Sequence, residues 1–230
     1  MNYLDRPEAR TVNEAITSRR SIRAFLPDPV PREMITRILE VAGRTPSGSN
    51  IQPWNVDVVL GEALDQLTTA ISDRFDAGDA GDEAYQYYPA PWREPYLARR
   101  RETGWGLYSA LGIEKHEKDR MRAQHRRNFL FFDAPVGLIF TIDGDLPVGS
   151  WLDTGMFLQS IMVAARGLGL DTCPQQAFAA YHQTIREMLD LPEDRTVICG
   201  MALGLADWSD PANGFEARRV PVEEFTQFHD

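Results

Sequence analysis

Basic and hydroxyl side chains gather near the start of the chain in a pattern that suits an anion. Arg19, Arg20 and Ser21 are consecutive, and Arg23 follows two residues later. Guanidinium and hydroxyl groups at a helix end can hold a phosphate through charge-assisted hydrogen bonds, each contributing about 1.5–3 kcal/mol. A solvated helix end is the alternative, because basic side chains also favour the negative C-terminus of a helix. Four residues do not by themselves identify a cofactor.

A second polar segment, residues 46–54, reads PSGSNIQPW. Its small residues would let the backbone approach a planar ligand closely, while Asn50 and Gln52 supply both hydrogen-bond donors and acceptors. Such groups can bind the polar edge of a heterocycle without carrying net charge. The alternative is a turn that joins a helix to a strand, although the segment holds more amides and prolines than a turn requires.

Hydrophobic patterning predicts the elements that must position these two segments. Helices are expected at residues 12–19, 34–42, 62–75, 107–129, 150–168 and 181–189, and strands at residues 54–60, 136–142, 170–173 and 197–205. Periodicity is largely lost in residues 76–106, where aromatic rings are frequent; this predicts a functional excursion or a partner-wrapping arm rather than plain disorder. Helices gathered between widely spaced strands favour an α+β fold.

Bulk composition narrows the class of protein. A chain of 230 residues suits one domain, and the formal net charge of −10 argues against binding to nucleic acid or to an anionic membrane. No stretch is long and apolar enough to span a bilayer, and the charged first residues argue against a signal peptide. Cys173 and Cys199 form no disulfide framework, and four scattered histidines make a metal site unexpected. We expect a cytoplasmic protein without a metal.

The two polar segments, taken together at this spacing, strongly resemble the nitroreductase family. The resemblance rests on SRRSIR at residues 18–23 followed by PSGSNIQPW, and it continues through DAPV at 133–136, TCPQQA at 172–177, residues 200–204 and the pair Arg218-Arg219. It is weakest in residues 76–106. It implies a three-layer α+β domain with a central, mostly antiparallel sheet and helices on both sides, assembled as an intertwined homodimer. We expect one domain over residues 1–230, with a lid at about 76–128 and a tail at about 207–230.

The resemblance also implies the cofactor and its ligands. FMN would lie at the subunit interface, with NADPH or NADH as co-substrate. The residues implied to bind FMN are Arg19, Arg20, Ser21, Arg23, Pro46, Ser47, Ser49, Asn50, Gln52, Pro174, Gln175, Gln176, Ala177 and Arg219. The arginines and Ser21 would hold the phosphate and the polar flavin edge from one chain, and residues 46–52 would approach from the other. A backbone N–H of Gln176 or Ala177 would contact flavin N5.

A flavin carries the electrons itself, so the protein needs no dedicated acid–base pair and no separate dinucleotide fingerprint. We expect hydride transfer from NAD(P)H through FMN to a nitroaromatic or quinone-type acceptor by a ping-pong mechanism, with Trp105 or Tyr108 as candidates for stacking on substrate. The Gln176-Ala177 pair replaces a Glu-Gly pair familiar in some relatives, which leaves acceptor choice open. Dehalogenation, flavin fragmentation and a non-enzymatic flavin-binding role are the alternatives.

Residues 93–127 form a basic segment, with ten Arg or Lys against five acidic side chains. One interpretation is a solvated, salt-bridged helical face. The other is that this segment borders the flavin and attracts an anion, either NADPH or a nitroaromatic carboxylate, since positive potential on an acidic protein raises the association rate of anionic ligands.

Overall fold

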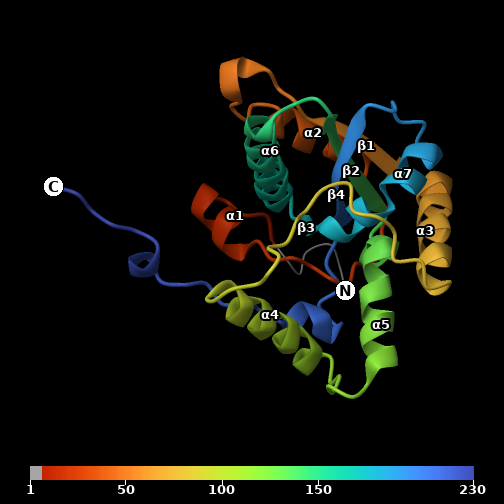
Figure 1. The fold of residues 1–230 in the computed structure, drawn as a ribbon. Helices are drawn as coiled ribbons and strands as arrows, with labels where there is room; N and C mark the ends of the chain where they lie inside the picture. Colours follow the sequence, from red (N-terminus) through yellow and green to blue (C-terminus); the bar gives the residue numbers. More distant parts are fainter. Residues whose placement is uncertain (1–6) are drawn as a thin grey trace.

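A computed structural model describes residues 7–230 (Figure 1), and the charged N-terminal residues that argue against a signal peptide lie largely outside this range. The fold is α+β around a four-stranded antiparallel sheet in the order β1-β2-β4-β3. The strands are β1 Asn55–Leu60, β2 Val136–Asp143, β3 Asp171–Gln175 and β4 Arg195–Gly204. β1 and β3 are therefore the two edges, separated by β2 and β4.

Helices cover both faces of the sheet, as expected (Figure 1). The helices are α1 Val12–Ser18, α2 Arg32–Ala42, α3 Gly61–Asp76, α4 Tyr96–Ala110, α5 Lys118–Arg126, α6 Val148–Gly167 and α7 His182–Met188, with short 3₁₀ segments η1 Gly48–Asn50, η2 Arg127–Asp133, η3 Gln176–Tyr181, η4 Pro211–Gly214 and η5 Val222–Glu224. One face packs on α2 and α6, and the other packs on α3, η2, η3 and α7. The three-layer prediction is confirmed.

Strand β2 shows why the sheet is buried on both faces. Val136, Leu138, Phe140 and Ile142 enter the core beneath α2 and α6, while Ile139 enters the opposite core. Side chains alternate between faces along a strand, so both faces of β2 must be covered by helices. This central strand holds the two layers of helices together.

Helix α4 corrects the expectation that regular structure resumes only after residue 106. It begins at Tyr96, although no residue of the helix is buried and its apolar residues follow no helical stripe. Packing on Phe215 from the C-terminal tail stabilises it, since a Cβ added at Gly106 would lie 2.3 Å from the Phe215 ring. A contact between segments so far apart in sequence is invisible in a local window.

Candidate flavin site at the sheet edge

The Arg19–Arg23 segment, the first of the two polar segments, lies beside β3. Helix α1 ends at Ser18 and the chain becomes extended at Arg19. Ser21 pairs with Thr172 in a parallel bridge, and the Ile22 N–H donates to the Thr172 carbonyl at 3.1 Å. Because β3 ends at Gln175 and leads directly into η3, two groups of residues implied to bind FMN lie at one edge of the sheet.

Asn213 brings the C-terminal segment to the same edge. It is almost completely buried, and its side chain accepts from the Arg23 N–H at 2.7 Å and donates to the Ala24 carbonyl at 2.8 Å. A second donation, to the Asp207 carbonyl at 2.8 Å, ties the tail in place. Asn213 was not singled out in the sequence, where nothing distinguishes it from a turn asparagine.

A cavity of about 560 Å³ opens where these segments converge. It is lined by Ile16, Thr17, Arg19, Arg20, Ser21, Arg23, Thr103, Gln159, Phe215, Glu216, Ala217 and Arg219. All four arginines and the serine implied to hold phosphate are present, so the donor set fits a phosphate monoester. Thr103 from α4 and Gln159 from α6 were not foreseen, because single polar residues on long helices carry no local signal.

Glu216 is the one carboxylate among the lining residues, and it pairs with Arg20 at 2.6 Å. Both side chains are solvent-accessible, which limits the strength of the pair. Arg23 instead donates to the Ser21 carbonyl at 3.2 Å. Arg20 therefore faces a carboxylate within the cavity, whereas Arg23 contacts a neutral carbonyl.

Cys173 lies beneath these arginines and is fully buried. Burial raises the pKa of its thiol to about 11, although the guanidinium groups of Arg23 and Arg19 oppose this by favouring the thiolate. A protonated thiol in an apolar environment is unreactive, so the side chain packs as a small hydrophobe.

The segment Pro174–Ala177 forms the end of β3 and the start of η3. The Gln175 amide donates to the Asn128 carbonyl at 2.6 Å, and the Gln176 amide donates to the Tyr85 hydroxyl. The side-chain amide oxygen of Gln175, Oε1, is buried without a hydrogen-bond partner and is an unmet acceptor at this corner. Both glutamine side chains are thus engaged by the protein, leaving the backbone of the segment as the part available to contact a cofactor.

Residues 46–52 precede β1 and therefore lie at the opposite edge of the sheet from β3. The loop is shaped by internal contacts: Ser47 Oγ accepts from the Gln52 N–H at 2.9 Å, and Ser49, Asn50 and Gln52 all have positive φ. Such φ values are uncommon for residues with a side chain and mark a specified loop shape rather than a generic turn. In one chain, two strands separate this loop from the arginine cavity.

Trp105 and Tyr108 lie on α4, where their rings are 5.9 Å apart and Lys115 covers the Trp105 ring at 5.1 Å. Trp105 lines a separate, shallow cavity with residues 109–116 and not the arginine cavity. Substrate stacking by either ring stays a prediction.

Several cations of the basic segment 93–127 are engaged by neighbouring groups. Arg126 pairs with Asp76 at 2.7 Å, Arg127 with Asp133 at 2.9 Å, and Arg120 with Glu117 at 2.9 Å. Arg93 and Arg100 instead lie over the rings of Tyr96 and Trp92, and Arg99 reaches Glu224. These contacts support the salt-bridged face rather than a focused anion attractor.

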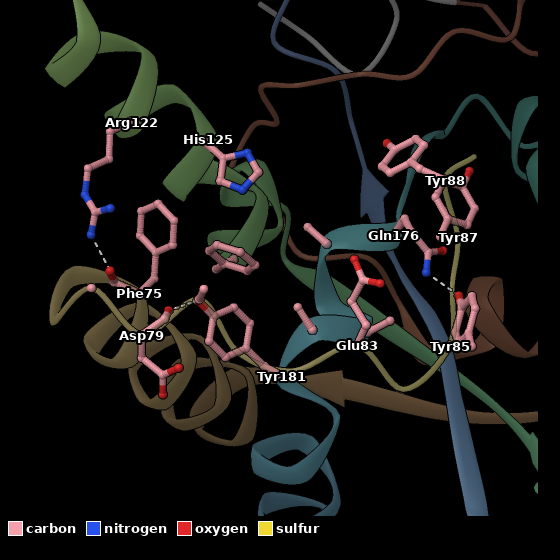
Figure 2. A pocket seen from close by; sticks show the side chains of 16 residues that line it. Phe75, Asp79, Glu83, Tyr85, Tyr87, Tyr88, Arg122, His125, Gln176 and Tyr181 are labelled. Atoms are coloured by element: carbon pink, nitrogen blue, oxygen red, sulfur yellow. Dashed lines mark hydrogen bonds between the residues drawn. The ribbon is translucent and has the colours of Figure 1, made fainter. Parts of the chain in front are cut away.

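A second cavity, of about 440 Å³, lies on the α3 side of η3 (Figure 2). Aromatic rings from α3, η2, η3 and the loop at residues 78–88 dominate its wall, together with Gln176 and Ala177. His125 borders it, and burial followed by the nearby Arg122 charge lowers the pKa of that imidazole, which favours the neutral form. Gln176 and Ala177 therefore line an aromatic cavity, whereas the arginine cavity is lined by other residues.

Within residues 7–230, none of the helices combines the length and apolar character that crossing a bilayer requires. The same residues hold no group of three or more His, Cys, Asp or Glu side chains placed to bind a metal ion.

Comparison with known proteins gives one consistent result. Residues 16–205 match the sequence profile of the Nitroreductase family. The chain is 44% identical to the chloronitrobenzene nitroreductase of Comamonas testosteroni, over 96% of this chain and 98% of that protein. It is 38% identical to a 4-nitrobenzoate reductase of Pseudomonas putida, with 93% of both chains covered. The crystal structure of the FMN- and NADPH-dependent nitroreductase NfnB from a Sphingopyxis strain superposes with a TM-score of 0.93 at 37% identity, covering 96% and 99% of the two chains.

Proposed function

This chain belongs to the nitroreductase family, and from that premise we propose that it is an FMN-dependent oxidoreductase. Its reductant is NADPH or NADH, and its acceptor is a nitroaromatic or quinone-type compound. The observation that carries the proposal is the arginine cavity, in which Arg19, Ser21, Arg23 and Arg219 converge beside β3. The names of the relatives, which include reductases of nitroarenes, support the same acceptor class.

Each part of the site has one task. FMN, when bound, supplies the two-electron chemistry, so the protein has to bind and orient it. Arg19, Ser21, Arg23 and Arg219 would hold its phosphate, because their donors line one cavity. The backbone of Gln176 or Ala177 would donate to N5, since the side chains of Gln175 and Gln176 are held by Asn128 and Tyr85.

We further propose that the site is shared between two copies of the chain. The loop at residues 46–52 and the arginine cavity belong to opposite edges of one sheet, so a second subunit would have to bring them together. The exposed apolar residues Val148, Leu152 and Met156 recur every four residues along α6 and offer a surface for such a partner. Free, buried Cys173 and Cys199 suit a cytoplasmic setting.

The test of the proposed function is steady-state kinetics on purified protein loaded with FMN. We expect reduction of nitrobenzene by NADPH or NADH with parallel lines in double-reciprocal plots, because one face of the flavin would serve both substrates in turn. Flavin that stays oxidised after anaerobic addition of both nicotinamide nucleotides would contradict the proposal and favour a non-enzymatic flavin-binding role.

Acceptor charge can be tested in the same assay. Because Arg120, Arg126 and Arg127 of the basic segment form ion pairs, we expect added salt to change kcat/KM for 4-nitrobenzoate and for nitrobenzene by similar factors. A decline confined to nitrobenzoate, and abolished by neutralising Arg99, Arg100 and Arg101, would instead show that the segment attracts anionic acceptors.

A further inference from the structure

Tyr85 joins the loop at residues 78–88 to the segment Pro174–Ala177 through its hydroxyl. The hydroxyl accepts a hydrogen bond from the Gln176 side-chain amide, and Figure 2 shows the two side chains meeting at the rim of the aromatic cavity. The same hydroxyl donates to the carbonyl of Ile198 in β4. One phenol therefore uses both its donor and an acceptor position, and it does so between two segments of the framework.

The Ile198 carbonyl is available because β4 is irregular at this point. Phe140 of β2 faces Cys199, whereas the next residue, Thr141, faces Val197, so Ile198 is the extra residue of a β-bulge. On its other side, β4 pairs with β3 only from Gly200 onward. A buried carbonyl left outside both ladders needs a donor from elsewhere, and Tyr85 provides it.

The ring of Tyr85 is also fixed. It packs edge-on against Trp151 of α6, with ring centroids 4.4 Å apart at 74°. Burial raises the pKa of the phenol above its ordinary value, which keeps the hydroxyl protonated and able to donate at neutral pH. Tyr85 thus contacts α6, β4 and the start of η3, and these contacts hold its hydroxyl in one place.

We propose that Tyr85 is a positioning residue of the flavin site: by holding the side chain of Gln176, it fixes the backbone N–H groups of Gln176 and Ala177 that contact the flavin. This inference rests on the proposed function. Gln176 has several rotatable bonds, and without a partner its backbone at the β3–η3 junction would sample more orientations. The loop that carries Tyr85 and the electronic environment of the cofactor are thereby linked through one hydrogen bond.

The test compares Tyr85→Phe with Tyr96→Phe, which removes the same atom from an exposed tyrosine on α4. In FMN-free protein, hydrogen–deuterium exchange of the peptide spanning residues 174–179 should be several-fold faster in Tyr85→Phe and unchanged in Tyr96→Phe. In FMN-loaded protein, the equilibrium between oxidised and reduced flavin should shift by about two- to ten-fold, the size expected when one hydrogen bond is disturbed. A ten-fold shift is about 30 mV for a two-electron couple.

Gln176→Met provides the second variant, because it removes the amide donor while leaving the Tyr85–Ile198 bond intact. We expect the same shift in flavin potential, and the double variant should show no further shift, since the Tyr85–Gln176 hydrogen bond is the contact that both changes remove. An unchanged potential in both single variants, with FMN bound, would overturn the positioning role while leaving the proposed function standing. Protein that binds no FMN in any form would instead refute the proposed function.

Discussion

Arg19 is the residue for which the phosphate site makes the sharpest prediction. It lines the cavity beside Ser21 at the point where the chain leaves α1. Replacing Arg19 with alanine should weaken FMN binding about ten-fold or more, because one charge-assisted hydrogen bond contributes about 1.5–3 kcal/mol. Quenching of flavin fluorescence on titration measures this directly. Arg10→Ala, an exposed arginine outside the cavity, is the control, and equal affinities in both variants would rule out a phosphate contact by Arg19.

Substitution of Glu216 should change FMN affinity in the opposite direction from substitution of Arg19. Its carboxylate lies in the same cavity and neutralises Arg20 at 2.6 Å. Glu216→Gln should tighten FMN binding about two- to five-fold, because it removes a negative charge from a phosphate site and frees a guanidinium. The gain should shrink in high salt, where exposed charges are screened. Weaker binding by this variant would mean that the ion pair is needed to shape the cavity.

Cys173 should be inert toward thiol reagents despite lying beneath the arginines. Burial raises the pKa of its thiol from 9.0 to about 11, a difference that leaves about 100-fold less thiolate at pH 8. Labelling of native protein with a maleimide should therefore be slow at this pH and become fast on denaturation. Burial raises the pKa of the Cys199 thiol further, to about 12. Both cysteines should therefore react slowly with maleimide in the folded chain.

At the scale of elements, helix α4 packs closely on Phe215 of the tail. Gly106 faces the Phe215 ring, and a Cβ there would lie 2.3 Å from it. Gly106→Ala should therefore displace α4 or Phe215 and lower stability by about 1–3 kcal/mol. FMN affinity should fall with it, because Thr103 and Phe215 both line the arginine cavity. Thermal denaturation and flavin titration measure the two effects.

Gly104 supplies the matched control on the same helix. A Cβ at this position meets nothing within 4 Å. Gly104→Ala should raise stability by about 0.5–1 kcal/mol, because alanine loses less backbone entropy than glycine in a helix. If both alanine variants were equally stable, α4 would not pack on Phe215 in solution.

At the scale of the whole molecule, helix α6 and the C-terminal tail both leave large apolar side chains exposed on the single chain. Leu152 of α6 is 69% exposed, in line with Val148 and Met156. The C-terminal tail extends away from the body in Figure 1, and Phe225 and Phe228 on it are 69% and 86% exposed. Surfaces of this kind normally meet a partner. Both fit the proposed homodimer, in which the loop at residues 46–52 would reach the partner's arginine cavity.

Leu152→Glu tests this assembly. A charge buried in an interface is strongly unfavourable, so the variant should be monomeric and should lose FMN while its far-ultraviolet circular dichroism stays native. Light scattering after size-exclusion chromatography gives the mass, and flavin absorbance gives the cofactor content. Met188→Glu is the control, because Met188 is 40% exposed on α7, on the opposite side of the sheet. A folded Leu152→Glu monomer that binds FMN with full affinity would contradict the shared site.

The sequence by itself determined which residues could do chemistry and the class of fold that carries them. Consecutive basic and small polar residues at 19–23 and 46–54 are local patterns, and their pairing indicated the family. All four strands were predicted near their observed bounds, because alternation and β-branched residues act within a few positions. Helix α6 was predicted from its many apolar residues, which cover much of its circumference.

Only the tertiary structure decided which of these segments meet. The Ser21–Thr172 bridge, the Asn213 contacts with the Arg23–Ala24 backbone and the Tyr85–Ile198 bond each join residues more than a hundred positions apart. Such contacts follow from strand order and from a bulge in β4, and neither can be predicted from a short stretch of sequence. The first part of helix α4, residues 96–106, was not predicted for a related reason: the helix packs on a distant ring and has no apolar stripe to detect.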